Sequence, residues 1–344
     1  MKKVCYFTLY GREGASSKYR SYLFEKDLAS KCEIKWFSFW NDTYVKKYMN
    51  NKKKYALKIS IMYFFNLIKR YIQMLLIASR CDVVFFQKAC IPKSKINLIK
   101  FLRICKCRII FDVDDAIYLD KKDTSSYISG LCDLVIVGNS TLQEYYINYC
   151  DQVIVLPTVD DTRKYEEFYS NTYNSKVIGW IGSSSTIENL DIVIDAINEL
   201  IEKNSNISFT YISDSPKEYL KKIKNSHFVK WDAETYLEEI SKFTIGIMPL
   251  KINEYNSGKC GFKLVQYLNM KKPVIATDIG VNSEIVESCG ILIDNSVTEW
   301  IDSFNRLLNN ERIYYECISN IEKNFFGKYH YNIVLEKIYD VIGI

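Results

Sequence analysis

Short runs of β-branched and aromatic residues alternate with helical patterns along the chain, and this alternation constrains the fold more than any other feature. Strands that alternate with helices form parallel βαβ units. The first half is therefore expected to fold as a doubly wound α/β domain. Its predicted strands are Val4–Tyr10, Ile34–Phe39, Val83–Gln87, Ile109–Val113, Leu134–Gly138 and Val153–Leu156.

A polar stretch without apolar period interrupts this alternation, and the pattern then begins again. A chain of 344 residues suits two domains of roughly 150 residues each. Ligands of open α/β sheets bind outside the carboxyl ends of the strands, so two such domains are expected to face each other across a cleft. The second set of predicted strands is Val177–Ile181, Ile207–Ile212, His227–Lys230, Ile245–Met248, Val274–Ala276 and Ile291–Ile293.

These patterns predict four parts of the chain. Residues 1–160 form an N-terminal Rossmann-like domain, and residues 161–175 form a linker. Residues 176–326 form a second Rossmann-like domain. The last helix, over residues 327–344, is long enough to return to the first domain.

The composition excludes several classes of protein. The net charge is only +5, so no nucleic-acid partner is expected. The 11 cysteines are scattered without a Cys-x-x-Cys pair and the chain has 2 histidines, so neither a disulfide framework nor a zinc site is predicted. Reduced thiols indicate a cytoplasmic protein.

The segment Lys52–Ala78 raises the question of a membrane. Lys58, Lys69 and Arg70 interrupt its apolar residues, which argues against a helix that crosses a bilayer. An aromatic, basic, amphipathic helix is expected instead. Two interpretations stay open: the helix packs on its own domain with its lysines in water, or it lies on the inner face of a membrane.

The loop GREGASSKYRSY follows the first predicted strand. Gly14 lets the backbone approach a ligand closely, and Ser16 and Ser17 offer hydrogen-bond donors at the start of a helix. Arg20 adds a positive charge. A plain strand-to-helix turn with a serine cap explains the same residues, and both interpretations stay open.

The strand IIFDV ends in three carboxylates, Asp112, Asp114 and Asp115. Such a group can orient sugar hydroxyls, cap the following segment or bind a metal. The metal-binding Asp-x-Asp pattern belongs to a different fold, so no metal is predicted.

The stretch VIGWIGSSST places Gly182, Ser183 and Ser184 between a strand and a helix. Backbone N–H groups in such a turn form a pocket of the size of a phosphate.

Five ordered motifs resemble one known family, the retaining nucleotide-sugar glycosyltransferases of family 4, group 1, which have the GT-B fold. The resemblance covers most of the chain, and the order of the motifs is more specific than any one of them. The motifs are VLPTVD (Val155–Asp160), VIGWIG (Val177–Gly182), FTIGIMPL (Phe243–Leu250), GKCGFKLVQYLNMKKPVIAT (Gly258–Thr277) and IGVNSEIVESCGILI (Ile279–Ile293).

The resemblance implies roles for residues of the second half. The turn at Gly182, with Ser183 and Ser184, would meet the donor diphosphate. The family's Glu-x7-Glu element, which holds donor sugar and ribose, falls on Gly258 and Gln266. Both glutamates are therefore replaced.

Two phosphate-binding cations of the family are also absent from their usual places, and Lys259 and Lys263 are expected to replace them. Lys259, Lys263 and Gln266 stand at i, i+4 and i+7, a spacing that puts them on one face of a helix. Two ammonium groups at the start of that helix would restore the positive charge. An ordinary solvated face is the alternative.

In the first half, the strand IIFDVDD corresponds to a family strand that ends in His-Asp. Asp114 then stands at the position of the histidine, which contacts the transferred sugar, and Asp115 at that of the aspartate. The acceptor is expected near Gly14, Ser16, Ser17 and Arg20.

The sequence thus predicts a glycosyltransferase that uses a nucleotide diphosphate-sugar as co-substrate, with no other cofactor. The resemblance implies retention of configuration and no metal. Asp114, Asp115 and Lys259 are the predicted catalytic residues. A saccharide or lipid-linked saccharide of a surface polysaccharide is the expected acceptor. Two alternatives stay open: a non-catalytic nucleotide-sugar-binding relative, favoured by the missing glutamates, and a nucleotide-sugar epimerase.

Overall fold

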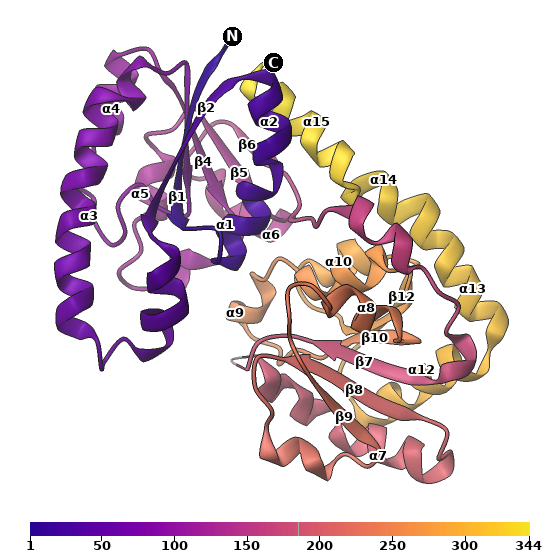
Figure 1. Ribbon diagram of the computed structural model, residues 1–344. Coiled ribbons are helices and arrows are strands. Elements are labelled where there is room, and N and C mark those ends of the chain that lie inside the picture. Colours follow the sequence, from indigo (N-terminus) through magenta and orange to yellow (C-terminus); the bar gives the residue numbers. More distant parts are fainter. Residues whose placement is uncertain (185) are drawn as a thin grey trace. The chain divides into compact units, whose positions relative to one another are not determined.

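The protein consists of two compact units. The structure, a computed structural model, describes residues 1–184 and 186–344. The first unit comprises Met1–Thr158 together with Val334–Ile344, and the second comprises Val159–Ile333. In each unit helices flank a central sheet (Figure 1).

The sheet of the first unit has six parallel strands in the order β2-β1-β3-β4-β5-β6. Each predicted strand of the first half is present to within one residue at either end. The strands are β1 (Lys3–Tyr10), β2 (Glu33–Trp40), β3 (Val83–Gln87), β4 (Arg108–Val113), β5 (Leu134–Val137) and β6 (Val153–Val155).

The second sheet is also parallel, in the order β12-β11-β10-β7-β8-β9. All its strands lie within one residue of their predicted bounds. They are β7 (Val177–Ile181), β8 (Ser208–Ser213), β9 (Ser226–Lys230), β10 (Ile245–Met248), β11 (Val274–Thr277) and β12 (Gly290–Ile293).

Helices connect the strands and continue to the C-terminus. The first unit contains α1 (Ala15–Arg20), α2 (Glu25–Lys31), α3 (Ala56–Leu76), α4 (Ile99–Ile104), α5 (Ser125–Ser129) and α6 (Ser140–Tyr146). The second contains α7 (Ile194–Lys203), α8 (Tyr236–Ser241), α9 (Glu254–Ser257), α10 (Phe262–Asn269), α11 (Asn282–Val286), α12 (Val297–Asn309), α13 (Glu311–Asn320) and α14 (Phe326–Tyr329). The last helix is α15 (Tyr331–Ile342), and the Arg108 guanidinium of β4 donates to the Val341 carbonyl at 2.6 Å.

The central strands are buried on both faces, as expected for parallel sheets covered by helices. Strand β3 reads VVFFQ and β7 reads VIGWI, and nearly all of their side chains are inaccessible to water. The second core is closed by Trp300 and Phe304 of α12, both fully buried. A capping box between Ser296 and Glu299 starts this helix.

The polar stretch 161–175 differs from the predicted linker because it packs within the second unit. Tyr165 is fully buried and donates to the Asp160 carboxylate at 2.8 Å. Thr172 donates to the Phe243 carbonyl at 2.5 Å and accepts from the Lys272 ammonium at 2.9 Å. Short 3₁₀ turns organise the stretch, and such turns leave no apolar period in a sequence.

Helix α3 exposes most of its apolar side chains. Arg70 is its anchor: the guanidinium is buried, donates to the carbonyls of Thr8 and Phe37 at 3.3 Å, and lies 4.4 Å from the centre of the Phe7 ring. By length and composition alone the stretch Ala56–Arg80 is apolar enough to cross a membrane, which is weak evidence because core helices of soluble proteins meet the same test. The exposed apolar residues of α3 are Leu57, Ile61, Phe64, Phe65, Ile68, Ile72, Leu75 and Leu76.

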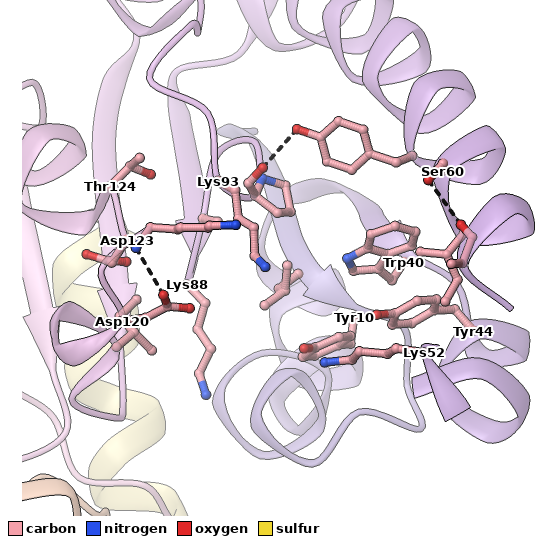
Figure 2. Close-up of a pocket in the computed structure, with 18 residues that line it drawn as sticks. Tyr10, Trp40, Tyr44, Lys52, Ser60, Lys88, Lys93, Asp120, Asp123 and Thr124 are labelled. Carbon is pink, nitrogen blue, oxygen red and sulfur yellow. Dashed lines mark hydrogen bonds between the residues drawn. The ribbon is translucent and has the colours of Figure 1, made fainter. Parts of the chain in front are cut away.

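A cavity of about 680 Å³ opens within the first unit, beside the first turns of α3 (Figure 2). Its wall includes Tyr10, at the end of β1, and Trp40, at the end of β2. The cavity therefore lies at the carboxyl edge of the first sheet, where ligands of parallel sheets bind.

Two glycines test the packing of the second unit. A Cβ on Gly246 of β10 would lie 2.3 Å from the Tyr267 ring, whereas a Cβ on Gly327 of α14 meets no atom within 4 Å. Gly246→Ala is expected to lower the free energy of unfolding by about 1–3 kcal/mol through overpacking.

Gly327→Ala is expected to raise the free energy of unfolding by about 0.5–1 kcal/mol, because alanine favours the helix. Urea unfolding measures both, and an unchanged Gly246→Ala variant would contradict the packing.

Candidate functional site

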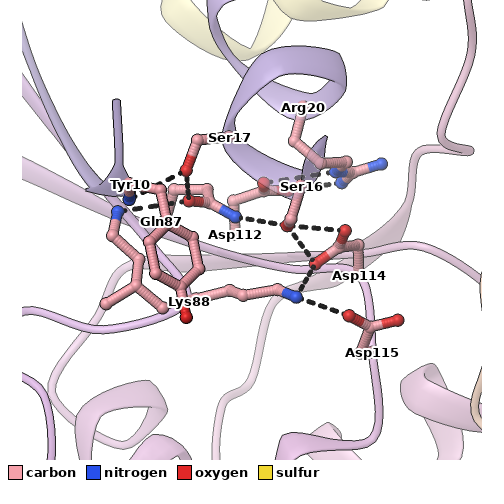
Figure 3. A network of polar contacts seen from close by, with 10 residues as sticks. Tyr10, Ser16, Ser17, Arg20, Gln87, Lys88, Asp112, Asp114 and Asp115 are labelled. Atoms are coloured by element: carbon pink, nitrogen blue, oxygen red, sulfur yellow. Dashed lines mark hydrogen bonds and ion pairs between the residues drawn. The ribbon is translucent and has the colours of Figure 1, made fainter. Parts of the chain in front are cut away.

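Polar side chains at the carboxyl ends of β1, β3 and β4 form a connected cluster, which we call the strand-end network (Figure 3). Asp114 lies at its centre and is 2% exposed. The Ser16 hydroxyl donates to the two Asp114 oxygens at 2.8 and 2.7 Å. The Lys88 ammonium lies 3.2 Å from Asp114 Oδ1 and also pairs with Asp115. The network comprises Ser16, Ser17, Arg20, Gln87, Lys88, Asp112, Asp114 and Asp115.

The loop after β1 supplies internal partners to this network. The Arg20 guanidinium pairs with Asp112, with Nε 3.2 Å from Oδ2 and both side chains less than a tenth exposed. The Ser17 hydroxyl donates to Gln87 Oε1 at 2.8 Å and is fully buried. A Cβ on Gly14 would lie 2.3 Å from Tyr10 Cβ, so this glycine permits close packing on β1. Direct contact of Gly14, Ser16, Ser17 or Arg20 with an acceptor stays a prediction.

The charges of the network support each other. Burial alone would raise the pKa of Asp114, but Lys88, Arg20 and the Ser16 hydroxyl outweigh it and hold that pKa below its usual value. The same carboxylates overcome the burial of Lys88 and raise the pKa of its ammonium. For Asp112, burial outweighs Arg20 and raises the pKa. Asp114 is therefore an anion at neutral pH, and Lys88 is a cation.

Lys88 was not predicted from the sequence, although it contacts Asp114 and Asp115, both predicted to be catalytic. It follows the buried strand β3 directly, which is the signal that was available. Its backbone adopts the left-handed region, with φ of 64°, and this turn directs the side chain toward β4. A left-handed lysine cannot be foreseen from sequence, because such conformations are uncommon for residues other than glycine.

In the second unit the Lys263 side chain passes over the predicted glycine turn. A Cβ on Gly182 would lie 2.6 Å from Lys263 Cε and 2.6 Å from the Trp180 ring. The Lys263 ammonium lies 5.6 Å from the centre of that ring. Burial and the nearby charge of Lys259 lower the pKa of Lys263 to about 8. This lysine is a poorly hydrated cation in contact with the turn.

The predicted common helical face of three residues is wrong for Lys259. Helix α10 begins at Phe262, after Gly261 in the left-handed region with φ of 63°, so Lys259 precedes the helix. Lys263 and Gln266 do lie on α10, three residues apart. Lys259 lies instead in the turn after Gly258, with its ammonium 5.2 Å from the centre of the Tyr255 ring. The left-handed Gly261 stands directly before α10, so the helix does not extend back to Lys259.

Ser184 binds a carboxylate of its own chain. Its backbone N–H donates to Asp214 Oδ1 at 2.6 Å, and its hydroxyl donates to Asp214 Oδ2 at 2.8 Å. Burial would raise the pKa of Asp214, but these hydrogen bonds lower it. These two donors of the turn therefore bind a carboxylate, and contact of Ser184 with a diphosphate stays a prediction. Asp214, which follows β8, was not identified in the sequence.

The structure gives the positions of Ser183 and Gln266 but does not test their predicted roles. The Ser183 carbonyl accepts from the Thr186 backbone at 3.0 Å, which closes the turn after Gly182. Gln266 is 6% exposed on α10. Contact of Ser183 with a diphosphate and of Gln266 with a ribose stays a prediction.

Comparison with known proteins identifies the second unit most clearly. Residues 175–310 match the family described as Glycosyl transferases group 1. Among curated proteins, none matches the sequence.

Solved structures show the fold of the whole chain. HepE from Anabaena, in complex with UDP, has a TM-score of 0.70 at 14% identity, and the match covers 100% of both chains. A glycosyltransferase from Rickettsia africae has a TM-score of 0.68 at 12% identity, with 99% and 98% covered. S. aureus TarM has a TM-score of 0.56 at 17% identity; 80% of this chain aligns, and it spans 58% of TarM. The fold is therefore GT-B, as the motifs predicted.

The strand-end network makes a prediction about stability. Lys88→Met leaves Asp114 buried without its cation, and breaking a buried pair in this way costs about 3–5 kcal/mol. The pKa of Asp114 is lowered in the folded protein, so its contribution is present above the unfolded pKa of about 3.9 and is lost as pH falls through the folded value. The deficit of Lys88→Met should therefore be large at pH 7 and shrink below pH 4.

Lys271→Met is the matched control. Lys271 also has a left-handed backbone, with φ of 55°, and pairs with Glu322 at 2.6 Å, but at the surface. Its loss should cost at most about 1 kcal/mol. Denaturant unfolding at both pH values measures the difference, and equal effects of the two variants would refute a buried network.

Proposed function

We propose that the chain is a nucleotide-sugar glycosyltransferase of group 1, which transfers a hexosyl residue from a nucleotide diphosphate-sugar to a saccharide or lipid-linked saccharide. The match of residues 175–310 to that family supports the proposal. The proposal includes retention of anomeric configuration and a reaction without metal. It assigns the donor to the second unit and the acceptor to the first. Relatives of the same fold contain UDP or UDP-glucose, so a UDP-sugar is the first donor to examine.

One observation carries the donor site: the contact between Lys263 and the Gly182 turn. A diphosphate at this turn would meet the desolvated ammonium group of Lys263. The electrostatic attraction is strong there, because little water screens the charge. Gly182 is required, since any side chain at this position would collide with Lys263 or Trp180.

The proposed reaction uses these charges to stabilise the leaving group. The bond between the anomeric carbon and the diphosphate oxygen breaks, and its electron pair leaves with the nucleoside diphosphate. The acceptor oxygen forms the new bond on the same face, and its proton passes to an oxygen of the departing diphosphate. Lys263 and Lys259 stabilise the negative charge that develops, which is the kind of catalysis that contributes most. Asp114 and Asp115 orient the sugar or acceptor hydroxyl.

Two other functions fit part of the site. Gly258 and Gln266 replace the expected glutamates, which favours a relative that binds a nucleotide-sugar without turnover. An epimerase would convert the donor without an acceptor. A turnover assay separates the three: binding without transfer or hydrolysis indicates the binding protein, conversion without acceptor indicates the epimerase, and transfer supports the proposal.

Donor binding should depend on the protonation of Lys263. Only the ammonium form attracts a diphosphate, and the pKa of this group is about 8 in the free protein. The affinity for UDP-glucose should therefore be highest near pH 7 and about tenfold weaker at pH 9. At 1 pH unit above the pKa, only about a tenth of Lys263 is still protonated. Calorimetry at the two pH values measures it.

Substitutions make this test specific to one residue. Lys263→Arg should bind equally at pH 7 and pH 9, because arginine stays charged. Lys263→Met should lose at least about tenfold in affinity at pH 7, since hydrogen bonds to charged groups contribute about 1.5–3 kcal/mol. The control is Lys203→Met, an exposed lysine at the end of α7. If Lys263→Met bound UDP-glucose as the wild type does, the donor site would lie elsewhere.

We also propose a peripheral location at the inner face of a membrane, with helix α3 as the contact, in the assembly of a surface polysaccharide. The support is the row of exposed apolar side chains, among which Leu57 is 78%, Phe65 65% and Phe64 59% exposed. Lysines 52–54 precede the helix, where they would attract anionic lipid headgroups. Arg70 holds α3 on the sheet, so contact along the helix is favoured over a crossing.

Vesicle binding tests this location. Wild-type protein should sediment with vesicles of phosphatidylcholine and phosphatidylglycerol, and Phe64→Ser with Phe65→Ser should reduce the partition at least tenfold. Burying each phenylalanine contributes about 1.5–3 kcal/mol, which accounts for that factor. Ile104→Ser with Ile147→Ser is the control, because both isoleucines are exposed and neither belongs to α3. Equal partition of the two double variants would count against α3.

A further inference from the structure

The cavity of the first unit has one aromatic side. Trp40 and Tyr44 stack with ring centres 4.1 Å apart, and the Tyr10 ring lies 6.4 Å from that of Tyr44. Tyr63 of α3 completes this side, and its hydroxyl donates to the Pro92 carbonyl at 2.9 Å. Apolar ring surfaces with few polar groups are typical of pockets that bind small organic molecules. The apolar face of a sugar ring suits such a surface.

The charges of the cavity favour an anion. Lys52, Lys93 and Lys122 line it, and in the described part of the chain no carboxylate pairs with them. The acidic lining residues have local partners instead. Asp123 accepts from the Ser125 backbone at 2.7 Å, and Asp120 accepts from the Lys122 backbone at 3.0 Å. The three ammonium groups thus remain available to an anionic ligand.

The cavity also adjoins the strand-end network. Lys88 and Tyr10 belong to its lining, and Lys88 pairs with Asp114 and Asp115. In Figure 2 the Lys88 and Lys93 side chains extend between the aromatic rings and the Asp120–Thr124 segment. A ligand in this cavity would therefore lie beside the predicted catalytic carboxylates.

Helix α3 connects the cavity to the exposed apolar row. Ala56, Ile59 and Ser60 line the cavity, while Leu57 and Ile61 of the same turns are exposed to solvent. A ligand with a polar head and a hydrocarbon chain fits this arrangement. Its head would lie in the cavity, and its hydrocarbon chain would lie on the exposed apolar side chains of α3.

From these observations we infer that the cavity binds the head of a lipid-linked acceptor, with a saccharide on the aromatic side and a diphosphate on Lys52 and Lys93. The inference rests on the proposed function, because it names the acceptor class of that reaction. The lipid chain follows α3. The acceptor hydroxyl lies toward Lys88 and Asp115.

Three soluble probes test the parts of this ligand on the full chain. They are N-acetylglucosaminyl geranyl diphosphate, geranyl diphosphate and free N-acetylglucosamine, with binding followed by calorimetry. The first should bind at least tenfold more tightly than the second, and the free sugar should bind least. Equal affinity of all three, or no binding of the first, would overturn the inference.

Variants locate the binding. Ser60→Trp fills the mouth of the cavity from an exposed position on α3, and Lys52→Gln with Lys93→Gln removes the cations. Each should weaken the first probe at least tenfold, whereas the control Lys31→Gln with Lys100→Gln, outside the cavity, should not. An unaltered affinity in the cavity variants would place the acceptor elsewhere.

A turnover assay distinguishes failure of the proposed function from failure of the acceptor cavity. If the wild type neither binds nor turns over any nucleotide-sugar, the proposed function fails. If the wild type transfers sugar and the cavity variants do so with an unchanged KM for the lipid-linked probe, only the acceptor cavity is refuted.

Discussion

Parallel strands place all their carboxyl ends at one edge of a sheet, and the chemistry of this protein depends on that constraint. In the first unit the ends of β1, β3 and β4 bring together Ser16, Lys88 and Asp114, which are far apart in the sequence. In the second unit the end of β7 brings Gly182 against Lys263 of α10. Each unit thus concentrates charge at the edge where ligands of such sheets bind.

Two partly buried lysines keep their positive charge in different ways. Lys88 has two carboxylate partners, which raise its pKa, so it acts as a fixed part of the framework. Lys263 has the Trp180 ring and the Gly182 turn beside it, and its pKa is lowered to about 8. Among the described residues no carboxylate pairs with Lys263, and a cation in that situation gains most from an incoming diphosphate. This difference separates the structural lysine from the proposed donor-binding one.

The strands were predictable because buried parallel strands are short apolar runs with sharp ends. The Gly182 turn and the carboxylates after β4 were predictable because they follow such strands directly. The position of Lys259 outside the helix was not, since Gly261 adopts a left-handed conformation directly before α10 begins. Lys88 and Asp214 were missed because their roles depend on pairing across strands. The stretch 161–175 is packed through hydrogen bonds of polar groups, which hydrophobic patterns do not reveal.

The proposed donor site depends on Lys263 being a poorly hydrated cation that binds the diphosphate. The pKa of Lys263 is the most direct measure of that environment. NMR titration of protein with 15N-labelled lysine side chains gives that pKa, with the signal assigned by its loss in Lys263→Arg. The account predicts a pKa of about 8 in the free protein and a clear rise when UDP is bound. An ordinary lysine pKa of about 10.4 that UDP leaves unchanged would contradict it.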